Sequence, residues 1–268
     1  MTNSYPVLVI SPDTVNEVIS WARQAGQIAL GYFKNVTPEL KPDNTFLTKA
    51  DLEIERYLGE QIRGTFPDHH MIGEEGTRDK NRAHSPNVWA VDPIDGTTAF
   101  VQGLPGWGIS IGLLHQGQPH FGLFYMPLLD DLTYTTAHGD VYCNGRNLKG
   151  RLRSDWADKG FLAIASTSHA DFTIKVRRTR ALGSIAVNLV YTARGTATAT
   201  FAPKANLWDV AAGAAILLRV GGELRYLSGR PVDYQQLLSG RLAPEPIIAG
   251  HPLVLEDLIE KIRSRRRE

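Results

Sequence analysis

A long stretch without a charged side chain constrains this chain most. Residues 96–129 contain no Asp, Glu, Lys or Arg, so most of this stretch must be buried, either in a membrane or in a protein core. Glycines, prolines and glutamines interrupt it, namely Gly103, Pro105, Gly106, Gln116, Gln118 and Pro119. We therefore expect no membrane span, and two paired strands at residues 109–114 and 120–125.

The remaining sequence alternates between helical and strand patterns. Ser11 followed by Pro12 is a helix start signal, which predicts a first helix over residues 15–33, and a second is expected over residues 52–66. We further expect strands at residues 88–91, 132–137, 161–165, 196–201, 223–227 and 246–249, and helices at residues 183–194, 207–220 and 251–265. This order predicts a layered α/β protein with an antiparallel first half.

Length and composition narrow the class of protein. At roughly 150 residues per domain, 268 residues allow one large domain or two packed halves. A candidate domain boundary near residues 146–155 would divide the chain into an N-terminal half (residues 1–148) and a C-terminal half (residues 149–268). Twenty-nine basic and 28 acidic side chains leave a net charge of +1, so no bulk field favours nucleic acid or an anionic membrane.

A single cysteine, Cys143, excludes an intramolecular disulfide and a cysteine-rich zinc site. The N-terminal residues lack the basic region of a signal peptide. We therefore expect a cytoplasmic protein.

Acidic residues repeatedly follow short apolar runs. Asp92 and Asp95 come directly after residues 88–91, and Pro93 is expected to end that strand. The pair Glu74 and Glu75 follows another apolar run, and Asp209 opens the helix expected at residues 207–220.

Each acid alone has a simpler interpretation: a surface turn at Asp95, a helix cap at Asp209, a solvated pair at Glu74 and Glu75. Together they would meet at the rim of a core. Two carboxylates 4 Å apart repel by about 1 kcal/mol in water and by more in a cleft. A hard divalent cation bound by oxygen ligands would relieve this repulsion, which points to Mg²⁺ or Mn²⁺.

Several segments resemble the signatures of the inositol monophosphatase family. They are IGEEG at residues 72–76, WAVDPIDGTTAF at residues 89–100, WDVAAG at residues 208–213, and TKAD at residues 48–51. The resemblance runs from about residue 15 to about residue 260. It implies the layered αβαβα sugar-phosphatase fold, a homodimer, and Mg²⁺-dependent hydrolysis of a small phosphate monoester.

The same resemblance implies a set of metal ligands. Glu74, Asp92 and the carbonyl of Ile94 would hold one Mg²⁺, and Asp92, Asp95 and Asp209 a second. Glu74 would contact a third, weaker ion through water.

Catalytic and substrate roles are implied in the same way. Thr97, hydrogen-bonded toward Asp51, would help Glu74 to orient and deprotonate the attacking water. The Gly96 and Thr97 amides would bind phosphate oxygens, and Asp95 would face the substrate. The segment at residues 183–185, with Ile185, would line the substrate pocket.

One position departs from the family pattern. Ala202 stands where family members that prefer inositol phosphates carry a Glu that contacts sugar hydroxyls, and Lys204 lies nearby. Histidinol phosphate, fructose 1,6-bisphosphate and a nucleotide 3′-phosphate therefore stay open as substrates. So does a regulatory binding protein on the same fold.

Other patterns are weaker. Residues 168–171 spell Ser-His-x-Asp, but adjacent residues do not form a relay. The pair His69 and His70 is expected to be a loop pair, and the basic C-terminal cluster (Arg263, Arg265, Arg266 and Arg267) a solvated helix end.

Overall fold

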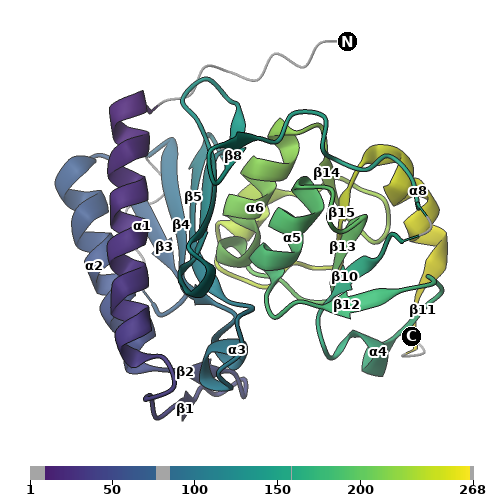
Figure 1. The fold of residues 1–268 in the computed structure, drawn as a ribbon, viewed down its shortest axis with the longest axis horizontal. Coiled ribbons are helices and arrows are strands. Elements are labelled where there is room, and N and C mark those ends of the chain that lie inside the picture. The colour runs from purple at the N-terminus through teal and green to yellow at the C-terminus, as the bar shows by residue number, and fades with distance from the viewer. Residues whose placement is uncertain (1–9, 77–84, 158, 266–268) are drawn as a thin grey trace.

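The computed structural model describes residues 10–76, 85–157 and 159–265 (Figure 1). The N-terminal residues considered as a signal peptide, and Arg266 and Arg267, lie outside the described residues. Two sheets and three layers of helices alternate. Helices α1 and α2 cover one face of the first sheet, α5 and α6 lie between the sheets, and α8 covers the far face of the second. The predicted αβαβα layering is confirmed.

The outer helices begin where the sequence supplies caps. Helix α1 (Pro12–Tyr32) starts after Ser11, whose hydroxyl accepts a hydrogen bond from the Thr14 amide at 3.1 Å. Helix α2 (Lys49–Thr65) starts with a capping box between Thr48 and Asp51. Their apolar faces pack against the first sheet.

The first sheet is built mainly from consecutive antiparallel strands. Its order is β3 (His70–Gly73), β4 (Asn87–Asp95), β5 (Gly108–His115), β6 (Gln118–Met126), β7 (Asp131–Thr135), β8 (Val141–Cys143) and β9 (Arg146–Asn147), with β3 parallel to β4. The uncharged stretch forms the hairpin β5–β6. Helices cover both faces of this hairpin, α1 on one and α6 on the other, which explains why it carries no charge.

Strand β4 extends further than predicted. It continues through Pro93 to Asp95, with a register shift against β5 between Asp92 and Asp95. The missing amide of Pro93 falls within this irregularity, where no ladder hydrogen bond is needed.

The second sheet has the order β12 (Thr179–Ala181), β10 (Leu162–Ile164), β13 (Ala199–Ala202), β15 (Ile247–Gly250) and β14 (Glu223–Tyr226). Its helices are α5 (Ile185–Ala193), α6 (Leu207–Arg219) and α8 (Pro252–Lys261). Shorter elements are β1 (Glu39–Leu40), β2 (Phe46–Leu47), α3 (Thr97–Val101), the 3₁₀ turn Pro127–Leu129, α4 (Ser168–Asp171), β11 (Phe172–Ile174), α7 (Tyr234–Leu237) and β16 (Ile262–Ser264).

The C-terminal helix is shorter than predicted. It ends at Lys261, and β16 pairs antiparallel with β11, because the buried Ile262 packs into the cluster that contains Phe172. Arg263 and Arg265 therefore lie on or beside a strand and not on a helix end.

Glycines let helix α6 approach the first sheet closely. A Cβ on Gly112 would lie 2.7 Å from Ala211 Cβ, and one on Gly122 would lie 2.2 Å from the carbonyl oxygen of Ala212. Only a hydrogen side chain permits this contact. The first turn of α6 is thereby held beside β4 and β5.

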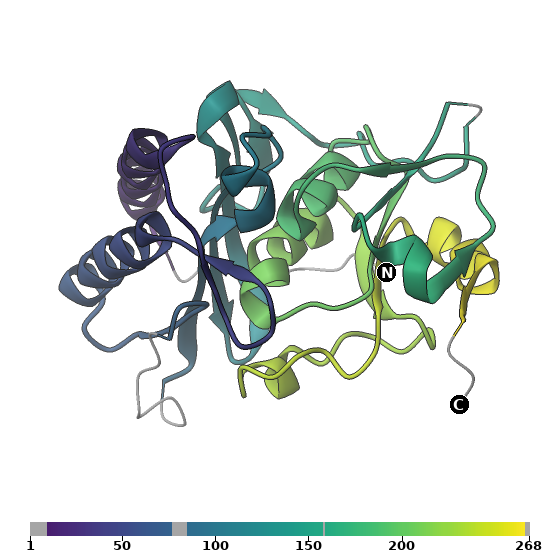
Figure 2. The same cartoon turned by 90° about the horizontal axis from the view of Figure 1, so that it is seen from below.

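The hairpin of β1 and β2 lies next to α3, at one end of the layers (Figure 2). Within the described residues, no helix is long and apolar enough to cross a membrane. The division into halves at residues 148 and 149 stays a proposal, since α6 packs against strands of both sheets.

Candidate active site and metal centre

Three aspartates from two distant parts of the chain lie close together. One carboxylate oxygen from each of Asp92, Asp95 and Asp209 lies within 4.8 Å of the others. Asp92 and Asp95 lie at the end of β4, and Asp209 in the first turn of α6. Asp92 and Asp95 are only 2% and 5% exposed. The site is therefore a buried carboxylate cluster between the two sheets.

Backbone amides hold each carboxylate in place. Asp92 Oδ1 accepts from the Ile94 amide at 3.1 Å, and Asp95 Oδ2 accepts from the Ala186 amide at 2.7 Å, at the start of α5. Asp209 Oδ2 accepts from the Asn206 amide at 2.6 Å. The N-termini of α5 and α6 thus both face the cluster, which favours negative charge there.

The amides do not offset the cost of burying the charges. Burial raises the pKa of Asp92 well above its usual value, and the charges of Glu74, Asp95 and Asp209 raise it further. Burial likewise raises the pKa of Asp95 to about 7, and burial and the charge of Asp95 raise the pKa of Asp209. Burial and mutual repulsion thus oppose ionisation of the cluster, and a bound cation would offset both.

Two glutamates extend the cluster toward the β1–β2 hairpin. Lys41 donates from Nζ to Glu74 Oε1 at 2.8 Å and to Glu75 Oε1 at 2.7 Å. Burial and the charge of Glu74 raise the pKa of Glu75 to about 8. Burial alone would lower the pKa of Lys41, but Glu74 and Glu75 outweigh it and the pKa is raised. Sequence reasoning missed Lys41, because nothing local distinguishes it from other lysines in loops.

Asp51 and Thr97 have partners other than those expected. Both the amide and the hydroxyl of Thr48 donate to Asp51 Oδ2, at 2.8 and 2.6 Å. The Thr97 hydroxyl donates to the Ile94 carbonyl at 3.1 Å, so in this structure its proton is not directed to Asp51. Asp51 Oδ1 is buried without a hydrogen-bond partner, and burial raises the pKa of Asp51 to about 6.

A third glutamate, which is buried, supports the pair Glu74 and Glu75. Glu55, one turn after Asp51 on α2, accepts from the Glu75 amide at 2.7 Å. Its Cδ would lie 2.3 Å from a Cβ on Gly73. The buried face of α2 could have revealed Glu55, since an acid there lies among apolar residues.

A cavity of about 780 Å³ opens at the cluster. Among the residues that the structure describes, its charged lining residues are Asp95 and Asp209, and none is a Lys, Arg or His. Gly96 and Ile185 line it as expected. Gly96 has φ +96°, and a Cβ there would lie 2.8 Å from the Gly106 carbonyl oxygen, so this turn requires glycine.

Apolar side chains form the wall away from the carboxylates, including Leu104, Leu129, Leu182 and Tyr191. Ala202 is not among the lining residues. It is 2% exposed on β13 and packs in the core, so the structure does not place it in contact with a substrate. Lys204 is exposed.

The weaker candidates have structural roles. His69 accepts from Trp89 Nε1 at 3.0 Å and stacks on Phe66, which makes it part of the core edge. His169 Nε2 lies 3.3 Å from the Thr179 hydroxyl, while Ser168 Oγ is buried without a hydrogen-bond partner. The Ser-His-x-Asp segment therefore forms no relay.

The residues fit an oxygen-liganded divalent cation. They offer several buried carboxylates with raised pKa values and no sulfur or imidazole ligand, the donor set of a hard cation. Comparison with known proteins agrees. A profile of the inositol monophosphatase family matches residues 12–265. This chain belongs to the inositol monophosphatase family. The predicted phosphoric monoester hydrolase is thus confirmed, as is metal dependence at the level of the family.

Individual relatives cover nearly the whole chain. Inositol-1-monophosphatase of Bacillus subtilis is 31% identical over 260 residues, 92% of this chain and 95% of its own. Nus factor SuhB of Pasteurella multocida is 31% identical over 271 residues, 93% and 95% of the two chains. The 2′-AMP-bound structure of inositol monophosphatase-II from Staphylococcus aureus has a TM-score of 0.76, 25% identity, and coverage of 92% and 93%.

Proposed function

We propose that the chain hydrolyses a phosphate monoester with Mg²⁺, and that its substrate carries one phosphate on a neutral or cationic, partly apolar leaving group. The buried carboxylate cluster supports the first part. The described residues that line the cavity include no cationic side chain, which supports the second.

The ligand assignments follow the sequence prediction. Glu74, Asp92 and the Ile94 carbonyl would hold one ion, and Asp92, Asp95 and Asp209 a second. Two or three Mg²⁺ ions are proposed, and Mn²⁺ could replace them, because both prefer oxygen ligands. When bound, the ions supply the positive charge that lowers the pKa of a water molecule and neutralises the phosphate.

Residues of the chain orient the water and handle its proton. Besides burial, the charge of Glu74 raises the pKa of Asp92, and Lys41 Nζ donates to Glu74 Oε1 at 2.8 Å. We propose that Glu74 accepts the proton of the attacking water. Thr97 and Asp51 would assist, since the unpaired Oδ1 of Asp51 is a free acceptor in a buried setting.

The N-terminus of α3 would receive the phosphate. The left-handed backbone of Gly96 turns the chain so that α3 begins at Thr97, beside the carboxylates. Phosphate oxygens are proposed to accept from the Gly96 and Thr97 amides. Ser184 and Ile185, at the start of α5, border the same cavity and would contact the leaving group.

The residues that line the cavity favour some of the candidate substrates over others. A second phosphate, as in fructose 1,6-bisphosphate or adenosine 3′,5′-bisphosphate, would find no cationic side chain among the described lining residues to pair with. Histidinol phosphate, inositol 1-phosphate and a nucleoside monophosphate need no such partner. Ala202 lies in the core and does not line the cavity, so it gives no ground for ranking inositol 1-phosphate below the other two.

Released phosphate, measured for matched monophosphates and bisphosphates with and without Mg²⁺, tests the proposal. We expect activity only with the metal, and kcat/KM for 2′-AMP at least about tenfold above that for adenosine 3′,5′-bisphosphate, the factor of one missing charge-assisted hydrogen bond. Asp92→Asn should abolish turnover, whereas Asp155→Asn, at an exposed loop position, should not. Full activity of Asp92→Asn would refute the metal assignment.

A regulatory binding role stays the alternative, favoured by the similarity to Nus factor SuhB. Negligible turnover of every ester, together with recovery of a defined partner in a pull-down, would support it. The homodimer and the cytoplasmic location also stay proposals, to be tested by light scattering and by cell fractionation.

A further inference from the structure

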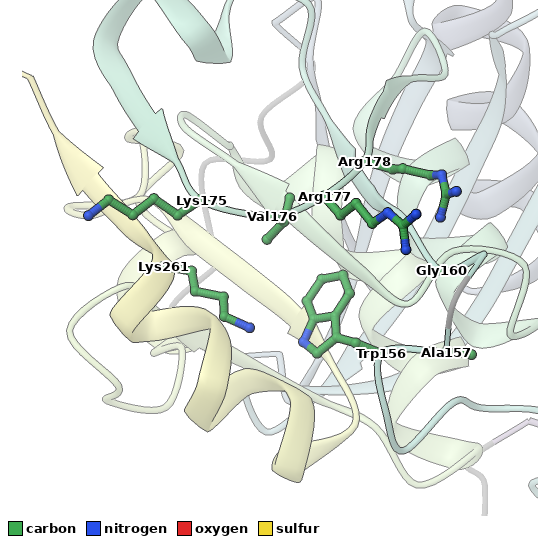
Figure 3. A pocket seen from close by; sticks show the side chains of 8 residues that line it. All are labelled: Trp156, Ala157, Gly160, Lys175, Val176, Arg177, Arg178 and Lys261. Carbon is green, nitrogen blue, oxygen red and sulfur yellow. The ribbon is translucent and has the colours of Figure 1, made fainter.

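A second cavity, of about 170 Å³, lies in the C-terminal part of the chain (Figure 3). It shares no lining residue with the cavity at the carboxylate cluster. Four cationic side chains and one indole line it: Lys175, Arg177, Arg178, Lys261 and Trp156. No carboxylate is among the lining residues, all of which belong to the described part of the chain. The charged described residues that line this cavity are thus cationic, whereas those that line the cavity at the carboxylate cluster are anionic.

The cationic segment is fixed to helix α8. The Lys175 amide donates to the Lys261 carbonyl at 2.8 Å, at the point where α8 gives way to β16. Arg263 Nη1 donates to the Ile259 carbonyl at 3.1 Å and so covers part of the negative end of α8. A backbone hydrogen bond therefore holds the cationic segment against the end of helix α8.

Two cations flank the indole of Trp156. Figure 3 shows the Arg177 guanidinium and the Lys261 ammonium on the sides of the ring, with Lys175 turned away. Lys261 Nζ lies 5.7 Å from the centre of the ring and is paired with Asp257. Arg177 has no ion-pair partner among the residues that the structure describes, so its charge is available to a ligand.

The indole itself lacks an acceptor. Trp156 Nε1 is buried and has no hydrogen-bond partner, and in Figure 3 it lies on the side of the ring that faces Lys261. A buried donor without an acceptor costs free energy. The Lys261 side chain above it is 36% exposed and can turn aside. Cations and an unpaired donor around one hollow are the features of an anion site.

We propose that this cavity binds a small phosphate-bearing anion, either inorganic phosphate or the phosphate of a monoester. Arg177 supplies a planar fork of donors that suits a phosphate, and Lys261 supplies a point charge. The volume equals that of about six waters at about 30 Å³ each, which suits a phosphate or a short ester and not a polymer. Such a site would let the level of free or esterified phosphate be sensed apart from the reaction centre.

Nuclear magnetic resonance of the tryptophan indole groups tests the proposal directly. The protein is first stripped of metal with EDTA, so that the carboxylate cluster repels phosphate. Potassium phosphate is then titrated at constant ionic strength, with chloride as the balancing ion. The chain has five tryptophans, and the Trp156 signal is the one lost in Trp156→Phe. We expect this signal to move and saturate, and that of Trp208, near the carboxylates, to move less.

The decisive comparison is between the phosphate affinities of Arg177→Gln and a control variant. Arg177→Gln should weaken phosphate binding by about tenfold, the factor of one charge-assisted hydrogen bond. Arg180→Gln is the matched control. Arg180 lies on β12 over the Phe161 ring at 5.1 Å, outside the lining, so its loss should change the affinity less than about twofold. Calorimetry with the same two variants gives the answer should Trp156→Phe fail to fold.

Further titrations show which form of phosphate binds. Glycerol 2-phosphate in place of phosphate distinguishes an ester from the free ion. A signal that does not move, a shift that does not saturate, or equal affinities of the two arginine variants would overturn the proposal. Tighter binding of a single-stranded oligonucleotide than of phosphate would also overturn it. Because Arg177 is remote from the carboxylates, Arg177→Gln should keep its phosphatase activity, and this outcome is separate from the proposed reaction.

Discussion

Stability of the metal-free protein should fall as the pH rises, because the carboxylate cluster is buried. In the unfolded chain Asp95 loses its proton near its ordinary pKa of 3.8, whereas the folded protein keeps it up to about pH 7. Between these values the folded state binds more protons than the unfolded state. The free energy of unfolding therefore decreases with pH over this window.

The pKa of Asp95 sets the magnitude. A rise from 3.8 to about 7 corresponds to about 4 kcal/mol of stability that is present below pH 4 and lost above pH 7. Asp95→Asn removes this titration. An asparagine oxygen can still accept from the Ala186 amide, which Asp95 Oδ2 binds at 2.7 Å. The variant should therefore lose less stability than the wild type between pH 5 and pH 8, by up to about 3 kcal/mol, the part of this contribution that falls in that window.

Urea unfolding in EDTA at pH 5, 6, 7 and 8 measures the effect. Asp155→Asn, at an exposed position, controls for a change in net charge. Mg²⁺ added at pH 8 should restore most of the lost stability in the wild type and less in Asp95→Asn, since a ligand of the folded state stabilises it. A wild type that is equally stable at pH 5 and pH 8 without metal would refute the reasoning.

Two further substitutions test the surroundings of the cluster. Lys41→Met should destabilise the metal-free protein by about 1–3 kcal/mol, because the carboxylates of Glu74 and Glu75 lose their cation. Added Mg²⁺ should reduce this loss. Urea denaturation measures the free energy of unfolding, with Lys49→Met as the control. Gly183→Ala should lower both the melting temperature and kcat/KM, since its Cβ would lie 2.1 Å from the Gly106 carbonyl oxygen at the cavity wall. Gly150→Ala also places an alanine at positive φ, +70° against +119° at Gly183, but in open space, so equal effects of the two variants would contradict the contact argument.

Much of the fold could be read from local patterns. The uncharged stretch predicted the hairpin β5–β6, and Ser11 with Pro12 predicted the start of α1, since caps and burial act over a few residues. The predicted ends of β4 and α8 were wrong. Strand β4 continues past Pro93 because its register against β5 shifts there, and α8 ends early because Ile262 is buried in the strand that pairs with β11. Both outcomes depend on partner strands that are distant in sequence.

Site residues divide in the same way. The grouping of Asp92, Asp95 and Asp209 followed from their places after apolar runs and from the family resemblance. Lys41, Glu55 and the partners of Thr97 did not, because each is defined by a contact across the fold. Ala202 was expected at the substrate and lies in the core instead.

The amino-acid sequence alone determined the kinds of chemical groups present: oxygen ligands for a hard cation, one cysteine, and apolar segments of strand and helix length. Only the tertiary structure decided how much water and which charges surround each of these groups. Whether a carboxylate is ionised depends on how much water surrounds it and which charges face it, and those neighbours come from β1, β4, α5 and α6 together. For the same reason only the folded chain shows that, among the described residues, acidic side chains line one cavity and basic side chains the other, although the net charge is nearly zero.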